Sequence, residues 1–240
     1  MKHFLYVAGF LLALLASPVC AQNLSQAEDF YRQGRFADAL TQYEQALKDY
    51  PNDPFVYYNI GNCYFKMGSS GLAAANYYRA FQLNPRDGDI RHNLELALAA
   101  GGEQWIDEDI PPALHQLFFY LSYPELKGLV FGLFWLWGVV ACVWLFKRKG
   151  STVLIVLSVL LAVSGLWLYA RYGLESRTLA VVAAPVAEVR SGPGSNFPAN
   201  ANVSQGHLLT VKDKKDNWYQ VVVNSQGIQG WLEAASLEKI

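Results

Sequence analysis

Two long uncharged apolar runs, separated by only four residues, constrain this chain more than any other feature. The first runs from Gly128 to Phe146 and the second from Ser151 to Ala170. Each is about one bilayer thick at a helical rise of about 1.5 Å per residue. Because the connection at 147–150 is so short, the two runs must form an antiparallel helical hairpin. A buried soluble hairpin is the alternative, but runs that are apolar on every face favour the membrane.

The orientation of this hairpin depends on the charges at its two ends. The connection carries three basic residues, which favours the cytoplasm, but three more basic residues flank the opposite ends, so the count is nearly tied. The N-terminal segment therefore decides the orientation. We expect transmembrane helices at 126–146 and 151–170, with residues 147–150 as a cytoplasmic turn.

Residues 1–21 have the three-part design of a secretory signal peptide. A basic start at Lys2 is followed by a dozen apolar residues, a helix-breaking Pro18 and small residues before the expected cleavage after Ala21. Cys20 raises the alternative of a lipoprotein, but Val19 directly before it fits the lipid-attachment box poorly. Since the signal sends the next segment outward, we expect a bacterial inner-membrane protein whose two flanking domains lie in the periplasm.

An internal repeat with a period of 34 residues precedes the hairpin. Residues 34–51 and 68–85 superimpose on each other. The matched positions hold two small residues, an aromatic residue, another small residue and a final proline. In the first copy these are Gly34, Ala39, Tyr43, Ala46 and Pro51. The alanines allow paired helices to approach closely, and the proline ends the second helix of its pair.

This pattern resembles the tetratricopeptide-repeat (TPR) family. We expect an all-α TPR domain over residues 22–100, made of two repeats and a capping helix at 89–100 that covers the last apolar face. The resemblance implies binding rather than chemistry, in a groove lined by the first helix of each repeat. Carried over residue by residue, the groove positions are Tyr58, Asn59, Asn62, Phe65, Lys66, His92 and Asn93.

Two modes of binding stay open for this domain. Some family members clamp a C-terminal carboxylate with paired Lys, Asn and Arg residues. Here Asn59 fits that pattern, but Leu24, Glu28 and Asp89 stand at other clamp positions, so the clamp is mostly absent. Because two repeats give a shallow groove, assembly with another protein through a flat face is the alternative.

Residues 101–125 are expected to form an acidic linker and an interfacial segment. The first part carries acidic residues between glycines and prolines, which is typical of a solvated tether. No histidine interleaves the acids, which argues against a metal site. The second part is amphipathic, and we expect Phe118, Phe119 and Leu121 to face the membrane surface.

After Arg177 the pattern changes to short alternating apolar runs bounded by turn residues, which predicts β-strands. Candidate strands are Thr178–Ala183, Val186–Arg190, Leu208–Asp213, Trp218–Val223 and Gly227–Leu232, with an edge strand at Leu237–Glu238. A Val-Arg-Ser-Gly-Pro-Gly loop, a strand that opens with Trp-Tyr and a late Gly-Trp resemble the bacterial SH3 domain. The resemblance implies a small all-β SH3-like barrel over residues 178–240.

Such domains often bind cell-wall peptides or peptide segments. The resemblance places the candidate ligand-binding residues at Arg190, Asn196, Trp218, Tyr219 and Trp231. The alternative is that the two tryptophans only pack a tiny barrel that has little else large to bury. Nearby lysines alternate with aspartates and fit a solvated turn rather than a nucleic-acid patch.

The sequence offers no catalytic constellation. Zinc-protease, nucleophile-elbow, phosphate-loop, C-x-x-C and dinucleotide motifs do not occur, and His92, His115 and His207 are scattered over three segments. Cys63 fits a small buried hydrophobe. The net charge of −1 provides no basic field for nucleic acid. We therefore expect neither catalysis, nor a cofactor, nor a metal.

The expected protein is a multidomain membrane protein made of an all-α TPR solenoid, a two-helix transmembrane hairpin and a small all-β SH3-like barrel. This order resembles the BatE family of the Bat (aerotolerance) operons of Gram-negative bacteria. The resemblance implies partnership with other Bat membrane proteins and with a cytoplasmic MoxR-type ATPase. We expect a non-enzymatic scaffold or adaptor for protein–protein interaction. An envelope sensor that binds peptidoglycan or peptides through its SH3-like domain is the alternative.

Overall fold

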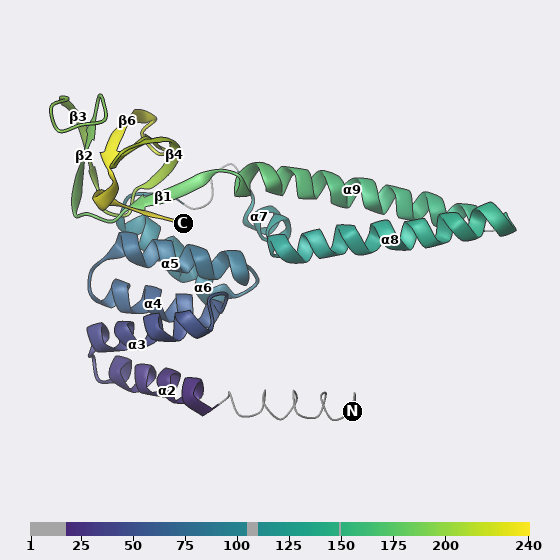
Figure 1. The fold of residues 1–240 in the computed structure, drawn as a ribbon, viewed down its shortest axis with the longest axis horizontal. Helices are drawn as coiled ribbons and strands as arrows, with labels where there is room; N and C mark the ends of the chain where they lie inside the picture. Colours follow the sequence, from purple (N-terminus) through teal and green to yellow (C-terminus); the bar gives the residue numbers. More distant parts are fainter. Residues whose placement is uncertain (1–17, 105–109, 149) are drawn as a thin grey trace, which may run out of the picture.

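The chain folds into a helical stack, a long helical hairpin and a β-sheet (Figure 1). The structure is a computed structural model, and it describes residues 18–104, 110–148 and 150–240. Most of the expected signal peptide, three acidic residues of the expected linker and one lysine of the expected cytoplasmic turn lie outside these ranges. The described residues include both a TPR-like helical region and a strand-rich SH3-like sheet, as the sequence predicts.

Five helices build the TPR-like stack. They are α2 (Pro18–Arg32), α3 (Phe36–Asp49), α4 (Pro54–Lys66), α5 (Ser70–Leu83) and α6 (Gly88–Ala100). The 34-residue repeat also appears in the residues that begin and end the helices. Asp53 caps α4 by accepting the amide of Phe55 at 2.8 Å, and one period later Asp87 caps α6 by accepting two amides, each cap contributing about 1 kcal/mol. Two glycines, Gly34 and Gly68, follow α2 and α4 at φ of 76° and 79°, a left-handed conformation that favours glycine.

Small and aromatic side chains alternate in the core of the stack. Ala39 and Ala46 of α3 are fully buried, and the corresponding Ala73 and Ala80 of α5 are buried as well. Tyr43 and Tyr77 fill the space between neighbouring helix pairs. Cys63 lies in the same core as Tyr43, where it acts as a small apolar side chain.

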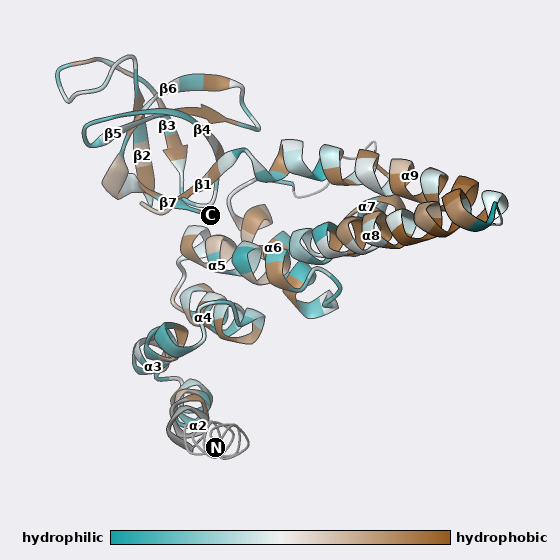
Figure 2. Ribbon diagram, turned by 45° about the vertical axis from the view of Figure 1, so that its right-hand side comes forward, coloured by the Kyte–Doolittle hydropathy of each residue, from teal (hydrophilic) through white to brown (hydrophobic). Residues whose placement is uncertain are grey.

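The hairpin consists of α8 (Tyr123–Lys147) and α9 (Ser151–Glu175), and both helices are long and apolar enough to cross a membrane. Both extend beyond the predicted spans at the end nearest the domains. The two helices are connected through left-handed residues at Arg148 and Gly150, and the indole of Trp137 donates a hydrogen bond to Ser158 Oγ at 2.9 Å. Figure 2 shows hydrophobic residues along the length of both helices.

The segment before the hairpin forms a short helix, α7 (Pro112–Phe118), at the hairpin base (Figure 1). The sequence predicts that Phe118, Phe119 and Leu121, at the end of α7 and just after it, face the membrane surface. These three side chains are instead half-buried against the protein. Phe119 packs against Phe81 of α5 with ring centres 5.6 Å apart, and the guanidinium of Arg171 lies 4.5 Å from the Phe119 ring.

Seven antiparallel strands form the SH3-like sheet in the order β3-β2-β6-β5-β4-β1-β7. They are β1 (Thr178–Val182), β2 (Val186–Arg190), β3 (Ala199–Ser204), β4 (Leu208–Lys215), β5 (Trp218–Val223), β6 (Ile228–Glu233) and β7 (Leu237–Lys239), with a 3-10 turn at Ala234–Ser236. The sequence analysis did not predict β3. Its apolar positions alternate with polar ones but are mostly small alanines, and Val203 is its one buried side chain, so the pairing with β2 forms the strand.

The strand β1 joins the sheet to the helical stack. Ala180 and Val182 point into the core of the sheet, while Val181 lies in the core of the stack. The helix α5 approaches so closely that a Cβ at Gly71 would overlap the carbonyl oxygen of Val182. The Arg79 side chain of α5 extends this contact by donating to Glu238 at 2.5 Å and to the Lys239 carbonyl oxygen of β7.

This contact makes a prediction for Gly71→Ala. In a free helix the alanine would stabilise by about 1 kcal/mol. Here we expect a lower thermal unfolding midpoint, because the methyl group would push β1 away. Gly88→Ala in α6, where a Cβ would meet nothing within 4 Å, is the matched control and should be neutral or stabilising. Circular dichroism of the detergent-solubilised chain measures both, and equal effects of the two changes would contradict the contact.

The core position of Cys63 makes a second prediction. Burial raises the pKa of its thiol to about 12, so almost no thiolate forms near pH 8. In a chain with Cys20→Ser and Cys142→Ser, we expect maleimide to modify Cys63 slowly in the folded protein and rapidly in guanidinium chloride. Mass spectrometry follows the reaction. Equal rates in the two conditions would show that the thiol is accessible.

Candidate functional site

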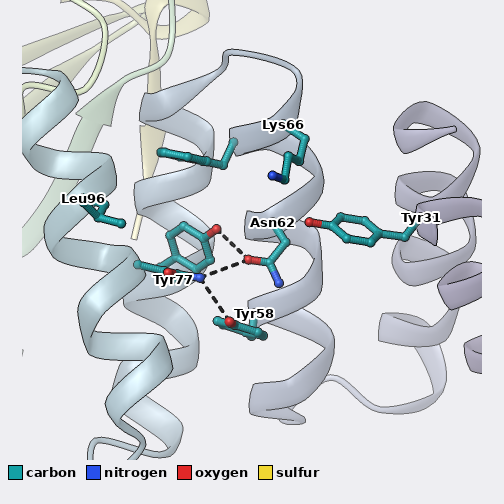
Figure 3. A pocket seen from close by; sticks show the side chains of 8 residues that line it. Tyr31, Tyr58, Asn62, Lys66, Tyr77 and Leu96 are labelled. Carbon is teal, nitrogen blue, oxygen red and sulfur yellow. Dashed lines mark hydrogen bonds between the residues drawn. The ribbon is translucent and has the colours of Figure 1, made fainter. Parts of the chain in front are cut away.

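A pocket of about 280 Å³ lies on the concave side of the helical stack (Figure 3). Helices α2, α4 and α6 supply most of its wall, and α5 adds one tyrosine. Its lining residues are Tyr31, Tyr58, Asn62, Phe65, Lys66, Tyr77, Asn93 and Leu96. The pocket thus combines aromatic rings, two amides and one ammonium group, and none of these lining residues is acidic.

A hydrogen-bond network fixes the polar groups of this pocket. The hydroxyl of Tyr77 donates to Asn62 Oδ1 at 2.7 Å, and Asn93 Nδ2 donates to the same oxygen at 3.2 Å. Asn93 Nδ2 also donates to the hydroxyl of Tyr58 at 3.0 Å. These bonds tie α4, α5 and α6 together, so the wall is ordered without a ligand.

The protonation state of Tyr77 also favours an ordered pocket wall. Burial, followed by the nearby Tyr58, raises the pKa of Tyr77 well above its ordinary value. Tyr77 therefore stays a neutral hydrogen-bond donor at any physiological pH. The charge of the pocket comes from Lys66, whose side chain is exposed at the rim and makes no ion pair within the described ranges.

Five of the seven groove positions taken from the sequence line this pocket, namely Tyr58, Asn62, Phe65, Lys66 and Asn93. The other two do not. Asn59 donates to the Phe55 carbonyl oxygen of its own helix at 3.0 Å, and His92 is exposed outside the pocket. That any of these residues binds a partner stays a prediction.

The sequence analysis missed three lining residues, and the repeat could have identified two of them. Tyr31 stands one period before Phe65, and Leu96 stands one period after Asn62. Tyr77 stands one period after Tyr43, at the aromatic position of the repeat. Its ring does pack, but its hydroxyl also reaches Asn62, because Gly61 lets the ring lie directly against α4.

The structure places the predicted SH3-like site residues on the outer face of the sheet, on its opposite face and in a loop. Trp218 and Trp231 lie half-buried on the outer face of the sheet, on strands β5 and β6, where they are diagonal neighbours. Arg190 pairs with Trp231 across β2 and β6. Tyr219 points to the opposite face and is 8% exposed, and Asn196 is exposed in the loop after β2.

The polar groups of Arg190 and Tyr219 have partners within the domain. The Arg190 guanidinium donates to the carbonyl oxygens of Ser195 and Phe197 at 3.0 and 2.7 Å and pairs with Glu188, so it holds the loop in shape. Lys239 lies over the Tyr219 ring and lowers the pKa of its phenol. What the outer face offers a ligand is therefore mainly the two indole rings.

The described parts of the chain contain no group of three or more His, Cys, Asp or Glu residues that could hold a metal ion. His207 bonds within the SH3-like domain, to the Ser204 carbonyl oxygen and to Gln226, and His92 is exposed on α6. The arrangement of the described residues suits binding, and TPR folds are generally non-enzymatic.

Family models match two parts of the chain. A TPR repeat model matches residues 27–68, and a tetratricopeptide repeat model matches residues 54–87. A bacterial SH3 domain model matches residues 183–239. The matched segments cover most of the helical stack up to α5 and the sheet from β2 onward, while α6 and β1 lie outside them.

Curated proteins resemble the chain over part of its length. Protein arginine N-methyltransferase 9 of Mus musculus is 30% identical over 107 residues, which are 41% of this chain and 13% of that protein, and the likeness runs through its TPR region. Tetratricopeptide repeat protein 16 of Homo sapiens is 35% identical over 57 residues, 24% of this chain and 6% of that protein. The chain thus spans a small part of both. Photosystem I assembly protein Ycf3 of Rippkaea orientalis is 29% identical over 117 residues, 45% of this chain and 66% of that protein.

Solved structures resemble the chain at low sequence identity. The type III secretion translocator chaperone SycD of Yersinia enterocolitica has a TM-score of 0.36 and 19% identity, over 65% of this chain and 91% of that chain. The first TPR of Spaghetti (RPAP3), bound to an HSP90 peptide, has a TM-score of 0.33 and 18% identity, over 34% of this chain and 64% of that chain. On the family models, the chain carries tetratricopeptide repeats followed by a bacterial SH3 domain.

Proposed function

We propose that this chain is a membrane-anchored, non-catalytic adaptor whose concave TPR pocket binds a segment of a partner protein. The observation that supports this most directly is the ordered wall of the pocket, where Tyr58, Asn62 and Asn93 share one hydrogen-bond network. A wall that is fixed before binding loses little conformational entropy when a ligand arrives. Together with the TPR repeats, this favours recognition of a polypeptide.

The chemistry of the pocket indicates which segment it would accept. Lys66 supplies one unpaired positive charge, and the lining carries no carboxylate. The rings of Tyr31 and Phe65 and the side chain of Leu96 provide apolar contact. An extended peptide with an acidic group next to an aromatic or aliphatic side chain satisfies both requirements.

Anchoring in a membrane is the second part of the proposal. The helices α8 and α9 have 25 residues each, about 37 Å at the usual helical rise, which exceeds the hydrocarbon thickness of about 30 Å. Their side chains are largely exposed within the described chain, as expected of surfaces that lipid covers. We infer that both helices cross the bilayer.

We further propose that both domains lie in the periplasm of a bacterial inner membrane. The support is the signal-like sequence of residues 1–21 and the even number of spans between the domains. The domain order also supports a role beside other Bat membrane proteins in an aerotolerance complex. In that arrangement the turn at 147–150 is the part that reaches the cytoplasm, so a cytoplasmic ATPase would act mainly through another subunit.

An alternative function is that of an envelope sensor that binds peptidoglycan or peptides through the SH3-like domain. The diagonal neighbours Trp218 and Trp231, half-buried on the outer face, favour it, because sugar rings and peptides stack readily on indole rings. This surface and the TPR pocket are separate, so single substitutions distinguish the two functions.

The pocket makes a prediction for peptide binding by the full chain in detergent micelles. On an array of matched acidic and basic peptides that contain aromatic residues, we expect a preference for the acidic set. Lys66→Ala should weaken that binding by at most about fivefold, as an exposed ion pair allows, and Lys66→Glu should reverse the preference. Lys48→Ala, which removes an exposed lysine of α3 outside the pocket, is the control.

The same assay tests the alternative function with a second probe. Isolated cell-wall sacculi should not retain the chain if the pocket is the main site. Retention by sacculi that Trp231→Ala abolishes, with peptide binding unaffected by the Lys66 substitutions, would favour the sensor over the adaptor.

Topology makes a separate prediction. Alkaline phosphatase fused after Ile240 should be active, because the enzyme folds in the periplasm, while a fusion after Lys147 should be inactive. Activity assays on intact bacteria measure both, with immunoblots to show that the fusions are present. The reverse pattern would place the domains in the cytoplasm.

A further inference from the structure

The short helix α7 exposes an apolar face that is largely uncovered within the described chain, although the Arg86 guanidinium lies 5.9 Å from the centre of the Tyr120 ring. Leu114 is 58% exposed, Leu117 is 64% exposed and Tyr120, two residues after the helix, is 56% exposed. The opposite face is turned to the protein, where His115 is buried and its ring lies 4.6 Å from that of Phe119. We call Leu114, Leu117 and Tyr120 the α7 apolar face.

Two side chains of α9 fix the position of α7 along the hairpin. The indole of Trp167 donates to the Phe118 carbonyl oxygen at 3.0 Å. Arg171, which is 2% exposed, donates to the carbonyl oxygens of Leu121 at 3.0 Å and Phe118 at 3.4 Å, and pairs with Glu175 at 3.0 Å. Phe118 is the last residue of α7 and Leu121 follows three residues later, in the region where a helix leaves its last oxygens without partners of its own. Because Arg171 satisfies them, α7 cannot slide along α9 without leaving these carbonyl oxygens and buried guanidinium N–H groups without hydrogen-bond partners.

The position of these two side chains sets the depth of α7. Trp167 is the seventeenth residue of α9, about 25 Å from its start at Ser151, and Arg171 lies about 6 Å further along. The hydrocarbon layer is about 30 Å thick. If α9 crosses the bilayer from Ser151, the bonds that hold α7 lie at the outer boundary between acyl chains and headgroups.

We propose that the α7 apolar face is a lipid-binding surface that inserts into the outer headgroup–acyl boundary of the membrane. This inference rests on the proposed insertion of the hairpin. The helix α7 lies at the base of the hairpin, beside the ends of α8 and α9 (Figure 1), which favours lipid over a protein partner. Exposed cations stand at the same end, with Lys127 on α8 and Arg177 after α9, where phosphate headgroups would lie.

The surface has a mechanical consequence for the domains. Phe119 packs against Phe81 of α5, and Arg86 pairs with Glu125 of α8 at 2.8 Å, so the helical stack is joined to α7 and to the hairpin base. With α7 in the boundary layer, the membrane would hold the base at a third point besides α8 and α9. Tilting of the domains relative to the bilayer would then expose the α7 apolar face to water.

Depth measurements on the full chain test this proposal. In a chain with Cys20→Ser and Cys142→Ser, an environment-sensitive fluorophore is attached at Leu117→Cys and, as a matched control on the same helix, at Gln116→Cys. Val139→Cys in the middle of α8 reports insertion of the hairpin. The proteins are reconstituted into vesicles of phosphatidylcholine and phosphatidylglycerol that carry nitroxide-labelled lipids.

We expect nitroxides near the headgroup end of the acyl chain to quench the label at 117 several-fold more than the label at 116. Nitroxides near the chain end should quench the label at 139 most. A quenched label at 139 with an unquenched label at 117 would overturn the lipid-binding surface and leave membrane anchoring intact. Unquenched labels at both positions would overturn both.

The role of Arg171 as a positioning residue has its own readout. In Arg171→Gln, or in Trp167→Phe if that chain does not fold, we expect weaker quenching at 117 and unchanged quenching at 139. Equal quenching at 117 with and without these substitutions would show that α7 finds its depth independently of α9.

Discussion

The strand β1 holds the molecule together because both of its faces are buried. One face packs into the sheet through Ala180 and Val182, and the other packs into the helical stack through Val181. Only Ser176 and Arg177 separate it from α9. Since β1 is also paired on both edges, with β4 and β7, its register is fixed from four sides. The sheet, the stack and the hairpin therefore share one strand as their common attachment.

The sequence predicted the helical stack well, since a period of 34 residues fixes which positions are small, aromatic or turn-forming. It predicted most of the pocket for the same reason. It could not predict that the Tyr77 hydroxyl reaches Asn62, because periodicity identifies faces and not distances. That contact depends on Gly61, where a Cβ would lie 2.7 Å from the Tyr77 ring. It likewise gave no sign that Asn59 would bond to its own helix rather than face the pocket.

The elements that the sequence analysis missed are those that tertiary contacts create. The strand β3 has almost no buried side chain and exists through its pairing with β2. The strand β1 was predicted, and its run Ala180–Val182 has no alternation because α5 covers one face of the strand and the sheet core covers the other. Phe118 and Phe119 turn away from the expected membrane surface because Phe81 and Arg171, far away in the sequence, offer them a place to pack.

The docking of the sheet also bears on how a partner can reach the TPR domain. A repeat stack that ends in an open apolar face can grow by adding a helix from another protein. Here β1 and β7 lie on α5, and Gly101, directly after α6, approaches Gly206 so closely that a side chain would not fit between them. Assembly through a flat face at this end is thereby blocked. The concave pocket, with its unpaired Lys66, combines a preformed shape with an unsatisfied charge, which is the basis for proposing that a partner binds in the groove.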